Sequence, residues 1–138
     1  MKYELLHLKQ FFPNLGTQSG DPLVKVYLPD NLTEMGRGDE RRPCLIVCPG
    51  GAYEFCSQRE AEPIAFHFLP EGFNVFVLLY SVAPHHYPAQ QCEAAALIEL
   101  INQNADIWHC DTGRIVLMGF SAGCLLYTSP SPRDRTRS

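Results

Sequence analysis

The stretch that decides the fold reads RIVLMGFSAG and occupies residues 114–123. Residues 114–118 form a short, largely apolar run, which is typical of a strand that is buried on both faces. Gly119 to Gly123 follow the pattern G-x-S-x-G, in which flanking glycines relieve the steric clash of a sharp strand-to-helix turn. The pattern predicts that this turn exposes the hydroxyl of Ser121 as a nucleophile at the carboxyl edge of a sheet. A structural Gly-Ser-Gly turn is the alternative.

Upstream of this stretch, apolar strands alternate with helices. The apolar runs at 44–48 and 74–80 are of strand length, and residues 89–105 place Cys92 and other apolar side chains on one face at helical spacing. This order of elements predicts an α/β fold with a parallel sheet that is covered on both faces. The expected elements are an edge strand within 3–12, strands at 23–28, 44–48, 74–80 and 114–118 (the last after a turn at 111–113), and helices at 60–69 and 89–105.

A second feature that carries chemistry follows the run at 44–48. The sequence Pro49-Gly50-Gly51-Ala52-Tyr53 supplies small residues, which let backbone N–H groups approach a ligand closely. A nucleophilic serine needs such donors for the oxyanion of its tetrahedral intermediate. We therefore predict an oxyanion pocket formed by the N–H groups of Gly51, Ala52 and Ala122. A plain Pro-Gly-Gly turn is the alternative, whereas a phosphate loop is disfavoured because neither glycine-rich phosphate motif occurs.

A third block, Tyr80-Ser81-Val82-Ala83-Pro84 followed by Tyr87-Pro88-Ala89, stands between the other two. Together the three blocks resemble the α/β-hydrolase superfamily, and within it the esterase/lipase group that includes acetyl-xylan esterases and hormone-sensitive-lipase-like carboxylesterases. That group carries H-G-G-G, then Y-R-x-x-P with P-A, then G-x-S-A-G. Three positions of this chain depart from it: Pro49 stands for the histidine, Ala52 for the last glycine of the first block, and Ser81 for the arginine.

The resemblance covers about residues 24–123 and implies a three-layer α/β-hydrolase sheet with a Ser–His–Asp/Glu mechanism on an ester. The implied substrates are short-acyl, above all acetyl, esters of carbohydrate or small alcohols. In this superfamily the acid and the histidine follow the serine in chain order. All five histidines precede Ser121: these are His7, His67, His85, His86 and His109. We therefore expect residues 1–123 to be the N-terminal half of a hydrolase domain, truncated after the nucleophile turn and inactive alone.

The last segment, 124–138, differs from the rest of the chain. It carries three Arg against one Asp, a charge of +2, whereas residues 1–123 carry 8 Lys and Arg against 14 Asp and Glu, a charge of −6. Its prolines cannot continue the buried helix that the superfamily has after the serine. The segment is predicted to lie outside the family, disordered or artefactual, and it resembles translated adaptor or vector sequence. The alternatives are a natural disordered tail and a functional Ser/Arg tail that is phosphorylated or binds RNA.

Composition and charge exclude several other classes of protein. With 46% hydrophobic residues and a net charge of −4, the chain is not disordered, and nucleic acid is disfavoured as a partner. No apolar window is long enough for a membrane span, and residues 1–13 lack the pattern of a secretory signal, so we expect no membrane association and a cytoplasmic location. The six cysteines are expected to be reduced thiols, and their spacing predicts no metal site.

We expect no cofactor, and the pattern of residues does not predict an oligomeric state. Two other functions remain open besides the esterase. One is a non-catalytic binding module of the same fold, which would bind acylated sugars or a partner protein. The other is a peptidase of the prolyl-oligopeptidase type, which shares the G-x-S-x-G turn.

Overall fold

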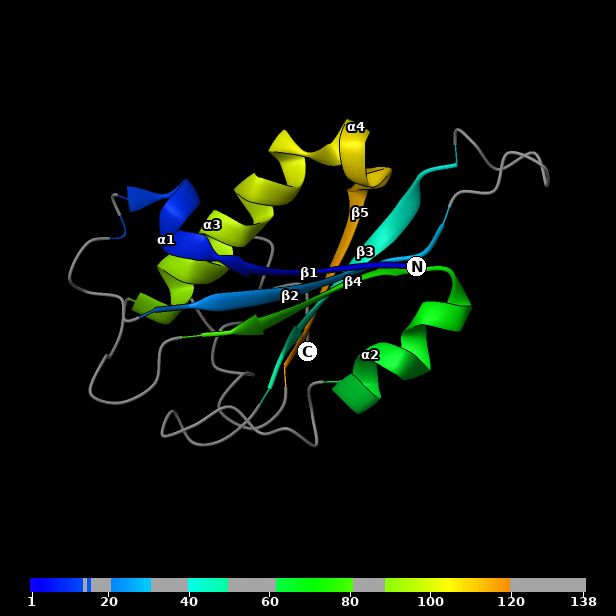
Figure 1. Ribbon diagram of the computed structural model, residues 1–138, viewed down its shortest axis with the longest axis horizontal. Coiled ribbons are helices and arrows are strands. Elements are labelled where there is room, and N and C mark those ends of the chain that lie inside the picture. The colour runs from blue at the N-terminus through cyan, green and yellow to red at the C-terminus, as the bar shows by residue number, and fades with distance from the viewer. Residues whose placement is uncertain (14, 16–20, 31–39, 50–61, 81–88, 120–138) are drawn as a thin grey trace.

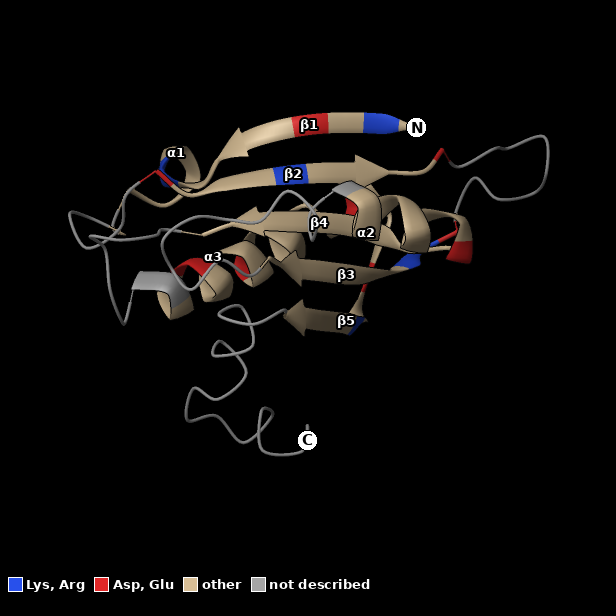
Figure 2. Cartoon of the chain, turned by 90° about the horizontal axis from the view of Figure 1, so that it is seen from below, with Lys and Arg blue, Asp and Glu red and all other residues tan. Residues whose placement is uncertain are grey.

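A computed structural model describes residues 1–13, 15, 21–30, 40–49, 62–80 and 89–119 of the chain (Figure 1). Within these residues the strands form a five-stranded sheet in the order β1-β2-β4-β3-β5 (Figure 2). The strands are β1 (Lys2–His7), β2 (Leu23–Leu28), β3 (Arg42–Cys48), β4 (Asn74–Leu79) and β5 (Cys110–Gly119). The helices are α1 (Leu8–Phe11), α2 (Glu62–Phe68), α3 (Ala89–Gln103) and α4 (Ala105–Trp108), with a 3-10 turn, η4, at Leu69–Glu71.

The sheet is mixed. β3 pairs in parallel with both β4 and β5, as the alternation of strands and helices predicts. β2 runs antiparallel to β4 and to β1, so the first two strands form an antiparallel edge on a parallel sheet. The predicted α/β class is confirmed, and the parallel arrangement holds for the three strands that the helices connect.

Helices cover both faces of the sheet. Alternate residues of a strand point to opposite faces, so each face packs its own set of side chains against helices. On one face, Ile46 and Phe76 pack with α1, α3 and α4, and the rings of Phe76 and Trp108 lie 5.6 Å apart. On the other face, Val47 and Val77 pack with Ala65 of α2. Because β3 and β4 are buried on both faces, they read in the sequence as continuous apolar runs.

The edge strand predicted within 3–12 is shorter than expected. β1 ends at His7, and the chain then turns into the helix α1. β1 pairs with β2 from Lys2 to His7, where it faces Leu23, the first residue of β2. The N–H of Leu8 still donates to the carbonyl of Pro22 at 3.0 Å, but proline has no N–H to donate in return, and the chain continues as helix α1.

The two predicted helices are present with different ends. α2 ends at Phe68, and the η4 turn that follows is closed by Gly72 with a φ of 95°, a conformation that glycine adopts without strain. Residues 60–61 of the predicted helix lie outside the described residues. The helix predicted over 89–105 breaks at Asn104, whose side chain donates to the carbonyl of Leu100 at 2.9 Å, and α4 follows it.

The last strand is longer than predicted, since β5 begins at Cys110. The prediction that residues 114–118 are buried on both faces is wrong, since Val116 is 40% exposed. The pairing of β5 with β3 shifts register between Cys110 and Ile115, where the turn at 111–113 was expected. The N–H of Gly113 donates to Asp111 Oδ1 at 3.0 Å, so the local turn is present as an irregularity within the strand. None of the helices in the described ranges has the length and hydropathy that a membrane crossing requires.

Candidate active site

The carboxyl ends of β3 and β5 lie side by side. Cys48 ends β3 and is the register partner of Gly119, which ends β5. Pro49 follows Cys48 and is buried. The loop predicted to hold the oxyanion donors and the turn predicted to hold the nucleophile therefore start from adjacent strands at one edge. The site residues themselves lie outside the described residues: these are Ser121, Gly51, Ala52 and Ala122.

The topology makes this edge a place for ligands. The connection from β3 to β4 runs through α2 on one face, and the connection from β4 to β5 runs through α3 on the other. As a result β4 and β5 lie on opposite sides of β3. In open α/β sheets, ligands bind outside the carboxyl ends of the strands where the strand order reverses in this way. The edge beyond Cys48 and Gly119 is such a position.

Tyr80 joins this edge from β4. It directly follows the last residue of β4, its side chain is only 2% exposed, and it packs in the core on the α3 side of the sheet. Its hydroxyl donates a hydrogen bond to the carbonyl of Pro49. The sequence places Tyr80 first in the Tyr80–Pro84 block but assigns it no role. The block itself was the signal that could have found it.

The start of α3 differs from the prediction at Cys92, and it buries a residue for which the sequence analysis predicts no place. Cys92, expected on the buried face with the apolar side chains, is exposed. Glu93 is instead fully buried. Helical spacing to Leu97 and Leu100 is compatible with the buried face for Glu93 as well as for Cys92. Hydropathy alone predicts that the cysteine is the buried one of the two. α3 begins at the carboxyl edge of the sheet, so Glu93 is a buried carboxyl group on the side of the candidate site.

The described histidines do not reach the candidate site. His7 ends β1 and its Nδ1 lies 3.1 Å from Asp21 Oδ1. β1 is four strand positions from β5, about 19 Å at the usual strand spacing, which is far beyond the reach of a general base. His109 precedes β5 and therefore lies at its amino end. His67 lies in the last turn of α2 with its ring against Phe68. His85 and His86 lie outside the described residues.

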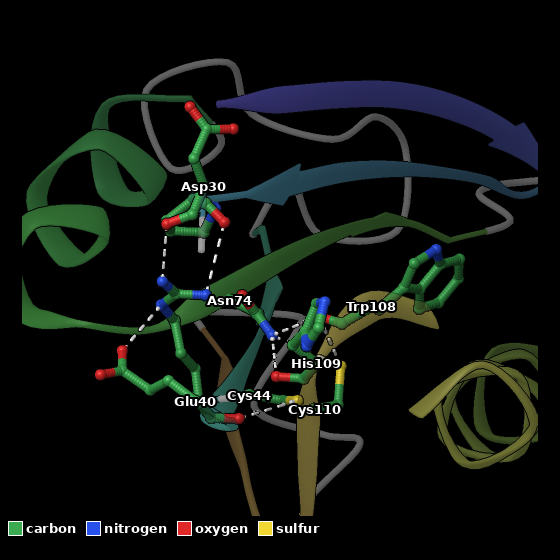
Figure 3. A network of polar contacts seen from close by, with 9 residues as sticks. Asp30, Glu40, Cys44, Asn74, Trp108, His109 and Cys110 are labelled. Atoms are coloured by element: carbon green, nitrogen blue, oxygen red, sulfur yellow. Dashed lines mark hydrogen bonds and ion pairs between the residues drawn. The ribbon is translucent and has the colours of Figure 1, made fainter. Parts of the chain in front are cut away.

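The opposite, amino edge of the parallel strands holds a network of polar contacts (Figure 3). The buried guanidinium of Arg42 donates to the carbonyl of Asp30 at 2.9 Å and lies 3.5 Å from the Glu40 carboxylate. Asn74 Nδ2 donates to the carbonyls of Trp108 and His109, each at 3.2 Å. The network ties the starts of β3 and β4 to the β2 end and to the turn before β5.

Two thiols belong to the same edge. Cys44 and Cys110 are fully buried free cysteines, and Asn74 Nδ2 lies 3.4 Å from Cys110 Sγ. The hydrogen bond with Cys110, together with burial, raises the pKa of Cys44 above its usual value. Hydrogen bonds from Cys44 and Asn74 lower the pKa of Cys110. Within the described residues, no group of three or more His, Cys, Asp or Glu is placed to hold a metal ion.

Comparison with known proteins assigns this arrangement to a family. Residues 25–128 match the BD-FAE family, an α/β-hydrolase type of esterase domain. The chain belongs to the BD-FAE family. The matched range includes the three sequence blocks and all of β3, β4 and β5. The predicted resemblance to esterases of the α/β-hydrolase superfamily is therefore confirmed.

Individual relatives agree with this assignment. The chain is 35% identical over 103 residues to endo-1,4-beta-xylanase B of Butyrivibrio fibrisolvens, which covers 70% of this chain and 16% of that protein. It is 36% identical, with a TM-score of 0.78, to the α/β hydrolase MGS-M1 from a Medee basin deep-sea metagenome library, covering 93% of this chain and 50% of that one.

Two further structures carry more specific names. The acetyl ester-xyloside bifunctional hydrolase of Caldicellulosiruptor lactoaceticus is 29% identical with a TM-score of 0.78, covering 89% of this chain and 44% of that one. The carboxylesterase Cest-2923 of Lactobacillus plantarum is 29% identical with a TM-score of 0.80, covering 99% and 50%. The chain thus spans about half the length, or less, of these relatives. Members of the family to which the chain belongs are hydrolases.

Proposed function

We propose that the whole protein to which this chain belongs hydrolyses carboxylic esters, with Ser121 as nucleophile and the N–H groups of Gly51, Ala52 and Ala122 as oxyanion donors. The observation that carries the proposal is the register pairing of Cys48 with Gly119. A nucleophile and its oxyanion donors must both lie about 3 Å from one reacting group. Loops that leave adjacent strands, about 4.8 Å apart, at the same edge can meet this requirement.

The reaction proceeds through an acyl-enzyme. Ser121 Oγ forms a bond to the acyl carbon while a histidine removes the hydroxyl proton, and the carbonyl electron pair moves onto oxygen. The backbone N–H groups donate hydrogen bonds to this oxyanion. Collapse of the intermediate breaks the bond to the alcohol, which leaves with the proton from the histidine. Water then attacks the acyl-enzyme by the same steps and releases the carboxylic acid.

The names of the relatives support an acetyl ester of a carbohydrate as the substrate. One structural relative is an acetyl ester-xyloside hydrolase, and a sequence relative is a xylanase. An oxyanion pocket does not depend on the alcohol, so the same machinery would act on small synthetic acetates. The acyl group and the sugar are chosen by the walls of the pocket.

The general base belongs, in this proposal, to a part of the whole protein that is not in the 138 residues. In the α/β-hydrolase fold the acid and the histidine follow the nucleophile along the chain. Residues 122–138 contain no histidine, and the described histidines lie away from the candidate site. An unassisted serine hydroxyl is a poor nucleophile at neutral pH. The 138-residue chain alone is therefore expected to show no ester turnover.

The test is Ser121→Ala in the whole protein, with release of p-nitrophenol from its acetate and of acetate from acetylated xylan as the two readouts. Loss of the nucleophile is expected to lower kcat by more than about 10³-fold. Thr112→Ala is the control, because it removes an exposed hydroxyl from the amino end of the same strand. Its kcat should stay at the wild-type value.

The other outcomes separate the alternatives. Undiminished turnover in Ser121→Ala would remove Ser121 from the mechanism. Cleavage of a prolyl p-nitroanilide without ester hydrolysis would identify a peptidase. Binding of acetylated xylan with no turnover by the wild-type protein would identify a non-catalytic module.

A further inference from the structure

Tyr80 stands at the point where β4 reaches the candidate active site. Its ring is 2% exposed and packs among the apolar side chains on the α3 face of the sheet. A buried tyrosine hydroxyl needs a hydrogen-bond partner, and the partner here is the carbonyl of Pro49. Pro49 is itself buried and follows Cys48, the last residue of β3. The hydrogen bond therefore connects the end of one parallel strand to the residue that follows its neighbour.

Pro49 offers a single backbone group for hydrogen bonding. Proline has no N–H, so its carbonyl is the one backbone hydrogen-bonding group of that residue. The next two residues are Gly50 and Gly51, which populate a wide range of backbone angles. A peptide bond is planar, so a fixed Pro49 carbonyl fixes the plane of the peptide that leads into the glycines. One hydroxyl can thus set the direction in which the loop leaves the sheet.

We infer that Tyr80 is a positioning residue for catalysis: its hydroxyl holds the Pro49 carbonyl and so aims the N–H groups of Gly51 and Ala52 at the oxyanion. The inference rests on the proposed function, because it needs the loop to supply oxyanion donors. Beyond the proposed function, it states that Tyr80 of the Tyr80–Pro84 block acts on the Pro49–Tyr53 block through a hydrogen bond. Tyr80 touches no reacting atom in this account.

The experiment is Tyr80→Phe in the whole protein, which removes the hydroxyl and keeps the ring. Loss of one oxyanion donor lowers kcat by about 10²–10³-fold. Loss of the alignment of the oxyanion donors is expected to lower kcat for p-nitrophenyl acetate by about tenfold or more. KM should stay within about twofold of the wild-type value. The rate is expressed per site titrated by a fluorophosphonate, so that unfolded protein does not count as lost kcat.

A second readout separates positioning from a general effect on the core. A boronic acid that forms a tetrahedral adduct with the serine places an oxygen in the oxyanion pocket, so its Kd should rise by the same factor as kcat falls. Tyr27→Phe is the matched control. Tyr27 is equally buried at 2% exposure but packs on the α2 face, with its ring 5.9 Å from Phe66. Its kcat and boronic-acid Kd should stay at the wild-type values.

The outcomes distinguish this inference from the proposed function. If Ser121→Ala is inactive while Tyr80→Phe keeps the wild-type kcat and boronic-acid Kd, the role of Tyr80 is wrong and the esterase stands. If Ser121→Ala stays active, the proposed function itself fails. If Tyr27→Phe loses kcat as much as Tyr80→Phe, the effect belongs to the core and the positioning role is overturned.

Discussion

At the amino edge of the parallel strands, the buried side chains of Arg42 and Asn74 bind the carbonyls of Asp30, Trp108 and His109. At the carboxyl edge, among the described residues, Tyr80 binds the carbonyl of Pro49. The first edge joins the ends of several elements to one another. The second holds the start of one loop. Removing a side chain at the amino edge should therefore change stability, whereas removing a backbone donor at the carboxyl edge should change the reaction.

The same contrast is seen in how the chain approaches each edge. The segments at the amino edge are α4 and the end of β2. The carbonyls of Trp108 and Pro29 in these segments are fully or partly buried, so they need hydrogen-bond donors. The carboxyl edge is left through segments rich in glycine, 49–53 and 119–123. Glycines let backbone groups approach a ligand, and they also allow more conformations, so such an edge needs a hydrogen bond that fixes its direction.

The largest effect is expected from Ala52→Pro in the whole protein. Proline removes one N–H that we assign to the oxyanion pocket, and this donor acts mainly in the transition state. We expect kcat to fall about 10²–10³-fold with little change in KM. Steady-state kinetics with p-nitrophenyl acetate measures both quantities.

The control for this change is Ala52→Gly, which keeps the N–H and restores the glycine found at this position in the H-G-G-G motif. It should keep most of the wild-type kcat. Circular dichroism shows whether proline has disturbed the fold. A raised KM with unchanged kcat in Ala52→Pro would mean that the loop binds substrate and does not hold the oxyanion.

A smaller effect, on stability and not on the reaction, is expected from Asn74→Ala at the amino edge. The change leaves the buried carbonyl of Trp108 and the part-buried carbonyl of His109 without the Asn74 donor and opens a small cavity. We expect the free energy of unfolding to fall by about 2–3 kcal/mol. The kcat of the folded fraction should not change. Urea denaturation and active-site titration give the two numbers.

Asn104→Ala is the matched control for Asn74. It removes one side-chain bond, to the carbonyl of Leu100, at a part-buried position between α3 and α4. Its loss of stability should be the smaller of the two. If Asn74→Ala lowered kcat as much as Ala52→Pro does, the amino edge would affect the reaction as well as stability. That result would contradict the proposed difference between the two edges.

The fold could be predicted from the sequence because its signals are local. β3, β4 and the core of β5 are apolar runs, and the helices between them have helical periodicity. The elements that were missed depend on distant partners. β1 ends at His7, where it faces the first residue of β2, and Asn104 ends α3 by binding a carbonyl of the preceding turn. Nothing in the hydropathy of 3–12 or 89–105 shows where these events occur.

The site was predicted less completely than the fold. That the 49–53 and 119–123 segments share an edge follows from the order of parallel strands, and the pairing of Cys48 with Gly119 confirms that their starting points are adjacent. The roles of Ser121, Gly51, Ala52 and Ala122 stay predictions. Hydropathy could not predict the burial of Glu93, because a carboxyl group scores as a surface residue. The acceptor of the Tyr80 hydroxyl is a tertiary contact that motif spacing does not contain.

The smallest effect concerns pH at the exposed rim of the amino edge. Arg41 donates to Asp106 in a hydrogen bond that, with the charge of Arg41, holds the pKa of Asp106 below its usual value. A carboxyl group with a lowered folded pKa stabilises the fold above its unfolded pKa, about 3.9, and this contribution is lost as the pH falls toward the folded value. Asp106→Asn should therefore lower the thermal midpoint slightly at pH 7, and the difference from wild type should shrink as the pH falls below about 3.9.

Salt and a second variant decide whether this pair is the cause. Both side chains are at the surface, so about 1 M salt should remove the difference at pH 7. In an Arg41→Gln background, Asp106→Asn should have no further effect, since the partner that lowers the pKa is gone. An equal effect of Asp106→Asn in both backgrounds would show that Asp106 stabilises α4 through its place in the first turn of that helix and not through Arg41.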